Sequence, residues 1–169
     1  MEQPSGPAEP EPVARIVEVG GKQMTEREAV AECVVSMTPE ACAQLVAGTP
    51  KGNPLEAARI AGVMGVKRTP DLLPFCHPIS VTGAEVVVEP DERAGTIRVR
   101  TTVRAVDRTG VEMEALTACT VAALTIYDMC KSTDRGMTIG EVALWEKTGG
   151  KTGTWRREPN TNGSGTSAF

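Results

Sequence analysis

One stretch of the chain, residues 111–132, combines the pattern of a buried helix with charged residues near both of its ends. From Ala115 to Ile126 every residue is apolar, small or a threonine, and none carries a charge. A helix of this composition is buried on most of its circumference rather than along one stripe. The sequence therefore predicts a central helix over 111–132, around which the other elements pack.

The start of this helix carries a capping pattern. Thr109 is a favourable N-cap residue, and Glu112 lies three residues later, where its carboxylate can accept a hydrogen bond from the cap amide. This interpretation accounts for Glu112 without a functional role. Glu114 lies beyond the capping position, although the helix dipole still favours a carboxylate there.

The end of the helix places Asp128 and Lys131 on one face, about 4.5 Å apart along the axis. Aspartate is unfavourable there, because it faces the negative end of the helix dipole. Two interpretations stay open. The residues form a local ion pair, or they form a general acid/base pair in which each group tunes the pKa of the other.

The composition limits the class of protein. The chain has 169 residues, of which 40 % are hydrophobic and 24 % charged, as is typical of one soluble globular domain. A net charge of −4 and an aromatic content of 3 % argue against a nucleic-acid surface. An anionic ligand would therefore need a local group of basic residues.

The cysteine and histidine content argues against a metal site. The five cysteines show no C-x-x-C spacing, and His77 is the only histidine. The sequence shows neither an apolar run long enough to cross a membrane nor a signal-peptide pattern. We therefore expect a cytoplasmic protein with reduced cysteines and no bound metal.

Three parts are predicted along the chain: a disordered tail over 1–12, one domain over 13–155 and a second disordered tail over 156–169. Besides the central helix, the pattern predicts helices over 39–46 and 54–66 and strands over 31–37, 79–89, 96–106 and 137–145. The second and third strands form an antiparallel hairpin. This order of elements predicts an α+β fold, with an antiparallel sheet and helices packed on one face.

The segment Phe75–Pro78 is stiff, because Pro74 and Pro78 each restrict the residue before them. His77 is either a hydrogen-bonded loop residue or a functional side chain that this stiffness holds in place. Lys67 and Arg68 end the second predicted helix and can also be interpreted in two ways. They complement the helix dipole, or they bind an anion.

Two glycine-containing loops carry lysines. Lys51 lies in a turn between the first two predicted helices, and Lys147 and Lys151 lie in the sequence K-T-G-G-K-T-G. The second loop is not a P-loop, because Trp145 stands where the first glycine is required and no helix follows. It either binds phosphate through its amides or is a flexible connection.

Glu114 and Asp128 are 14 residues apart. On one straight helix they lie about 21 Å apart along the axis and roughly 40° apart around it. One small ligand cannot touch both residues of a single helix. If both are functional, each site takes them from different subunits.

Several long motifs occur in the order in which they occur in the cyclic pyranopterin monophosphate synthases of molybdenum cofactor biosynthesis, and residues 15–155 resemble that family. The motifs are Lys51-Gly52, Lys67-Arg68-Thr69, Cys76-His77-Pro78, GVEMEALTA over 110–118, AALTIYDMCK over 122–131 and the K-x-G-G-K-x-G loop. The resemblance implies conversion of (8S)-3′,8-cyclo-7,8-dihydroguanosine 5′-triphosphate to cyclic pyranopterin monophosphate and diphosphate. It implies no cofactor.

The resemblance also implies roles for single residues. Asp128 is the expected catalytic acid/base, with Lys51 and Lys131 as its partners. The residues expected to bind the substrate are Phe75, Cys76, His77, Met113, Glu114, Lys67, Arg68, Lys147 and Lys151. The family is similar in forming a homohexamer of dimers with the active site at the dimer interface, and we expect a ferredoxin-like arrangement of the fold.

The chain departs from the family pattern at a few positions. The family usually has an aliphatic residue where Phe75 stands, and V-D-V-S where residues 17–20 read V-E-V-G. Thr148 and Thr152 replace the usual serines and keep the hydroxyl groups. None of these positions belongs to the expected acid/base group.

Two other functional classes explain part of the pattern. A non-catalytic nucleotide-binding module would use the same lysines, but it has no role for Asp128, whose charge weakens phosphate binding. A purely structural oligomer leaves the lysine- and glycine-containing loops unexplained.

Overall fold

The computed structural model describes residues 14–158. The predicted tail over 1–12 and all but the first three residues of the one over 156–169 lie outside the described residues. The elements are β1 (Thr25–Ser36), α1 (Pro39–Ala47), α2 (Pro54–Leu72), β2 (Val81–Asp91), β3 (Thr96–Asp107), α3 (Glu112–Cys130), β4 (Thr138–Thr148) and β5 (Trp155–Arg156).

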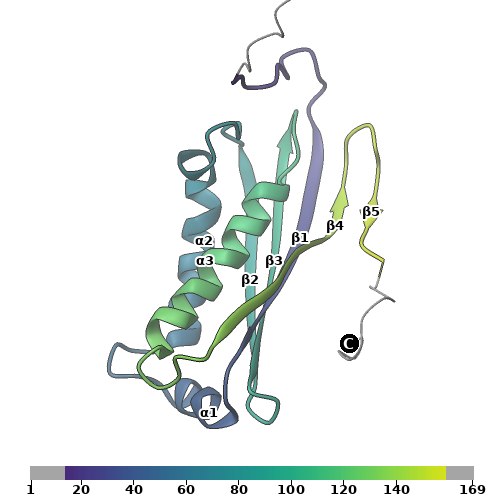
Figure 1. Ribbon diagram of the computed structural model, residues 1–169. Helices are drawn as coiled ribbons and strands as arrows, with labels where there is room; N and C mark the ends of the chain where they lie inside the picture. The colour runs from purple at the N-terminus through teal and green to yellow at the C-terminus, as the bar shows by residue number, and fades with distance from the viewer. Residues whose placement is uncertain (1–13, 159–169) are drawn as a thin grey trace, which may run out of the picture.

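The five strands form one antiparallel sheet in the order β2-β3-β1-β4-β5. Figure 1 shows α2 and α3 side by side on one face of this sheet, with α1 near the β2–β3 turn. α3 packs on β1, β3 and β4, and α2 packs on α3 and β2. The predicted α+β class, with an antiparallel sheet and helices on one face, is confirmed; the ferredoxin-like arrangement stays a prediction.

The predicted central helix is α3. Its small residues Ala115, Ala118 and Ala122 are fully buried, and they let α2 approach closely. A Cβ atom on Gly65 of α2 would lie 3.3 Å from the Cα atom of Ala118. The burial is one-sided, however, because Leu124 on the outer side is 54 % exposed in the single chain.

α3 also has the length and composition of a membrane span, with 19 residues and a mean hydropathy of 1.2 in its most apolar window. The sequence alone had predicted no run long enough to cross a membrane. In the structure the helix lies on the sheet, where Cys119 and Ile126 belong to the hydrophobic core.

α2 differs most from its predicted bounds. It continues past residue 66 to Leu72 and includes Pro70, a residue that usually ends a helix. The packing of α2 on α3 and the bond from Thr69 Oγ1 to the Gly65 carbonyl oxygen, 3.0 Å long, support this last part. Lys67 and Arg68 therefore lie inside the helix rather than at its end, which weakens their interpretation as dipole-complementing residues.

Two further differences come from charged residues. β1 begins at Thr25 instead of residue 31, and Glu28 in this added part pairs with Arg104 of β3. The predicted cap at Thr109 is wrong: the N-cap residue of α3 is Val111, and no side chain caps the helix. Glu112 forms an ion pair with Lys147 instead, with 3.2 Å between Oε1 and Nζ.

Candidate active site

Asp128, in the last turn of α3, is held between two lysines. Its Oδ1 accepts a hydrogen bond from Lys131 Nζ at 2.7 Å, and its Oδ2 accepts one from Lys51 Nζ at 3.1 Å. Lys131 comes from the same helix face, as the spacing predicts, whereas Lys51 comes from the connection between α1 and α2. The structure therefore brings the three expected catalytic residues together.

A tight turn positions Lys51. The amides and carbonyl oxygens of Thr49 and Gly52 bond to each other at 3.0 and 2.9 Å, and Gly52 adopts a φ of 114°, which favours glycine. The Lys51 amide donates to Thr49 Oγ1 at 3.2 Å. On the other side, the Asn53 side chain caps α2. The turn is thus anchored next to the start of α2.

The two lysines keep Asp128 charged. Hydrogen bonds from Lys131 and Lys51 lower the pKa of Asp128 below its ordinary value, and Asp128 raises the pKa of Lys131. The Asp128 side chain is 56 % exposed, so a ligand can reach it directly. A cavity of about 260 Å³ adjoins the group and is lined by Lys51, Met129 and Ser132 among others.

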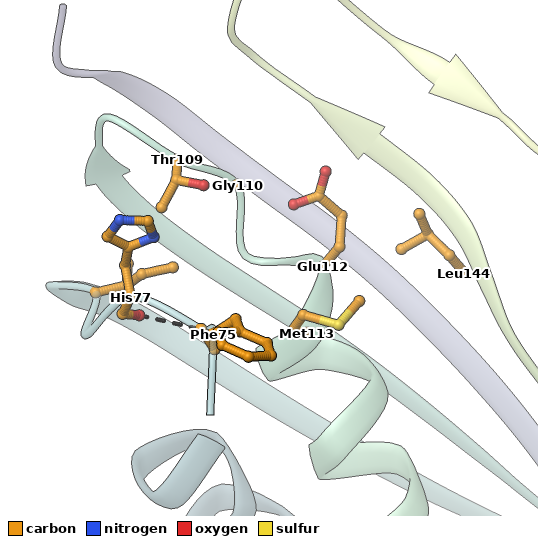
Figure 2. A pocket seen from close by; sticks show the side chains of 9 residues that line it. Phe75, His77, Thr109, Gly110, Glu112, Met113 and Leu144 are labelled. Carbon is orange, nitrogen blue, oxygen red and sulfur yellow. Dashed lines mark hydrogen bonds between the residues drawn. The ribbon is translucent and has the colours of Figure 1, made fainter. Parts of the chain in front are cut away.

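A second cavity, of about 410 Å³, lies at the other end of α3. Figure 2 shows its walls: Phe75 and His77 come from the loop after α2, Glu112 and Met113 from the start of α3, and Leu144 from β4. These walls include four of the expected binding residues, namely Phe75, Cys76, His77 and Met113.

Glu114 lies behind this cavity wall and is 1 % exposed. Its Oε1 accepts a hydrogen bond from Cys76 Sγ at 3.7 Å, and its buried Oε2 has no hydrogen-bond partner among residues 14–158. Burial raises the pKa of Glu114. Burial and the neighbouring Glu114 raise the pKa of Cys76 to about 11, so this thiol stays protonated.

Two further expected binding residues lie at the same end of the molecule. Lys147, near the end of β4, forms the ion pair with Glu112 at the cavity wall. Lys151 is exposed in the glycine-containing loop after β4. This loop packs on β1, since a Cβ atom on Gly149 would lie 2.1 Å from the carbonyl oxygen of Glu26. The two interpretations of the loop, a phosphate site or a connection, both remain compatible with this placement.

Lys67 and Arg68 are exposed in the second half of α2. Arg68 forms an ion pair with Asp71 at 3.2 Å. Neither basic residue is among those lining the two cavities, so their part in substrate binding stays a prediction.

Glu112 is the candidate that sequence reasoning missed. The capping pattern explained it without function, whereas the structure places it in the cavity wall beside Lys147. The sequence gives no signal of this contact, because it does not show that β4 returns to the start of α3.

Apart from Lys67 and Arg68, the expected residues thus form two groups at opposite ends of α3. Lys51, Asp128 and Lys131 lie at its C-terminal end, and the cavity with Glu114 lies at its N-terminal end, about 21 Å away along the helix axis. The single chain does not bring the two groups together.

The residues of both groups lie within the part of the chain that matches a known family. The model of the MoaC family matches residues 16–150. The chain belongs to the MoaC family. Among the proteins similar to it, the cyclic pyranopterin monophosphate synthase of Geobacter sulfurreducens is 54 % identical over 146 residues, which are 86 % of this chain and 91 % of the relative.

Two other relatives carry the same name. The protein of Pelotomaculum thermopropionicum is 53 % identical over 146 residues, 86 % of each chain. The protein of Brucella abortus is 52 % identical over 143 residues, 84 % of this chain and 87 % of the relative.

In the described part of the chain, no group of three or more His, Cys, Asp or Glu residues is placed to hold a metal ion.

Proposed function

We propose that this member of the MoaC family is a cyclic pyranopterin monophosphate synthase. It converts (8S)-3′,8-cyclo-7,8-dihydroguanosine 5′-triphosphate to cyclic pyranopterin monophosphate and diphosphate, as a lyase of molybdenum cofactor biosynthesis. Family membership and the names of the relatives support this reaction. The observation that carries it is the exposed Asp128 carboxylate between two ammonium groups.

This group suits proton transfer. Asp128, charged at neutral pH, accepts a proton from the substrate, and the lysines supply donors close to it. Opening and rebuilding the purine ring system requires proton transfers at several atoms, which a carboxylate and two amines can perform in turn. A module that only binds nucleotides gains nothing from a carboxylate at this position, because it repels phosphate.

The cavity at the other end of α3 supplies binding groups. Lys147 and Lys151 offer positive charge for the triphosphate and for the departing diphosphate. Because the net charge of the chain is −4, this local charge is what attracts the substrate. Burial raises the pKa of Glu114 and so disfavours a second negative charge beside this cavity.

The active site is shared between two subunits. Met113, Leu124 and Asp128 lie within about 60° of each other around α3, on the side that the rest of the chain leaves uncovered. A two-fold axis across this stripe near Thr120 brings the start of α3 in one copy next to the end of α3 in the other. Each dimer then has two complete sites.

The family resemblance extends this proposal to a homohexamer of such dimers in the cytoplasm. Sedimentation velocity of the purified protein tests the assembly. A monomer at micromolar concentration would contradict it.

A direct assay tests the reaction. The purified protein is incubated with the cyclised substrate, the pterin product is oxidised and its fluorescence is measured, and diphosphate is measured separately. Both products are expected in equal amounts. Substrate binding without either product would contradict the proposed function and support a nucleotide-binding module instead.

A further inference from the structure

The turn that carries Lys51 reads Thr-Pro-Lys-Gly over residues 49–52. A side-chain oxygen at the first position, proline at the second and glycine at the fourth are typical of a type I β-turn. Thr49 and Gly52 close the turn with two backbone hydrogen bonds, and Pro50 has a φ angle that its ring fixes. The backbone therefore holds the two ends of the turn, whereas Lys51 lies at its centre.

The side chain of Thr49 holds the centre of this turn. Its Oγ1 accepts a hydrogen bond from the Lys51 amide at 3.2 Å and donates one to the Gly52 carbonyl oxygen, also at 3.2 Å. Among residues 14–158, this hydroxyl is the only hydrogen-bond partner of the Lys51 amide. Rotation of the peptide between Pro50 and Lys51 would break the bond and change the direction in which the Lys51 side chain leaves the backbone.

The two lysines at Asp128 are held in place by different means. Lys131 lies three residues from Asp128 on the same helix, so the geometry of α3 brings them together. Lys51 comes from a distant part of the chain, and its side chain is long, flexible and 59 % exposed. The direction of the Lys51 backbone therefore decides whether its ammonium group lies at the carboxylate.

We propose that Thr49 is a positioning residue, whose hydroxyl holds the backbone of Lys51 so that the Lys51 ammonium reaches Asp128. The proposal rests on the proposed function for the catalytic role of Lys51. Thr49 also borders the cavity of about 260 Å³ beside this group. Direct contact of Thr49 with the substrate is therefore the competing role, and the test has to separate the two.

A double-mutant cycle with Lys51 tests the proposal. Thr49→Val keeps the shape of the side chain and removes the hydroxyl, so kcat should fall about fivefold, the order that one hydrogen bond contributes, with KM unchanged. Thr49→Ser, which keeps the hydroxyl, should retain the wild-type kcat. In the Lys51→Ala background, Thr49→Val should cause no further loss, because Thr49 acts only through Lys51.

An equal loss of kcat in both backgrounds would overturn the proposal, because Thr49 would then act independently of Lys51. An unchanged kcat in Thr49→Val, or a raised KM with kcat unchanged, would overturn it too. The matched control is Thr38→Val, which removes another hydroxyl that accepts a backbone amide at 3.2 Å, that of Ala41 at the start of α1. This variant should have a lower Tm but the wild-type kcat. If it lost as much kcat as Thr49→Val, general destabilisation would replace positioning as the explanation.

Crystal structures of Thr49→Val and Thr49→Ser without substrate test the same proposal without turnover. The Lys51 ammonium should lie outside hydrogen-bond distance of Asp128 in Thr49→Val and within it in Thr49→Ser. A Lys51–Asp128 contact that persists in Thr49→Val would overturn the proposal. Because these structures need no activity, their result is separate from the assay of the wild-type protein, whose failure alone would contradict the proposed function.

Discussion

Two carboxyl groups on the same helix lie in opposite environments. Glu114, near the start of α3, is 1 % exposed and its pKa is raised by burial, whereas Asp128, near the end, is exposed and its pKa is lowered by two lysines. Environments that move two carboxyl pKa values apart assign them different chemistry. This difference supports the proposal that the start of α3 binds the substrate and the end of α3 transfers protons.

Replacing Asp128 by Asn tests the proton-transfer end and has the largest expected effect. The amide nearly preserves the shape of the carboxylate but cannot accept a proton, so we expect turnover to fall by about 10²- to 10⁴-fold. Circular dichroism and sedimentation should be unchanged, since the amide nearly preserves the shape of the side chain. More than a tenth of the wild-type rate would show that Asp128 is not the acid/base group.

The two lysines around Asp128 should act as one unit with it. Lys51→Ala and Lys131→Ala are each expected to lower kcat by about 10- to 100-fold, and the double variant to be little worse than either single one. Steady-state kinetics on the three variants measures this. If the losses in kcat multiplied in the double variant, the two lysines would serve separate steps. They would then not act as one unit, although both contact Asp128 in the structure.

The pH dependence of stability compares the two ends directly and has the smallest expected effect. The pKa of Glu114 is raised by folding, so its contribution to the free energy of unfolding is present below the ordinary carboxyl pKa and is lost as the pH rises. Glu114→Gln should therefore gain stability relative to the wild type as the pH rises above the ordinary carboxyl pKa. Urea unfolding at several pH values measures the difference.

Asp128→Asn is the matched control, because its effect on stability is expected to change with pH in the opposite direction. The lowered pKa of Asp128 stabilises the folded state above the ordinary carboxyl pKa, and this contribution is lost as the pH falls. The variant should be less stable than the wild type at neutral pH, and the difference should disappear in acid. If the difference in unfolding free energy from the wild type changed with pH in the same direction for both variants, the contrast between the two ends of α3 would be contradicted.

Much of the fold could be predicted because local patterns and tertiary packing agree. The uncharged run of α3, the Asn53-Pro54 start of α2 and the turn between β2 and β3 each correspond to an observed element. The passage of α2 through Pro70 could not be predicted, because packing against α3 outweighs a local helix breaker there. The early start of β1 includes the ion pair of Glu28 with Arg104 of β3, which no local pattern shows.

The contacts of the site likewise fall into those that the sequence predicts and those that it does not. The spacing of Asp128 and Lys131 within one helix predicts their contact, and the structure confirms it. The contact of Lys51 with Asp128 spans 77 residues, and the sequence suggests it only through the family resemblance. Glu112 was misassigned because its partner Lys147 lies on a distant strand.

The central claim is that each active site takes the start of α3 from one subunit and the end of α3 from another. Glu114→Ala and Asp128→Ala proteins, each inactive alone, are mixed in equal amounts after dissociation and allowed to reassociate. Random pairing makes about half of the dimers mixed, and each mixed dimer has one intact site. Activity should therefore recover to about a quarter of the wild-type value per site, with exchange confirmed by native mass spectrometry. Full exchange without recovery would contradict the shared site.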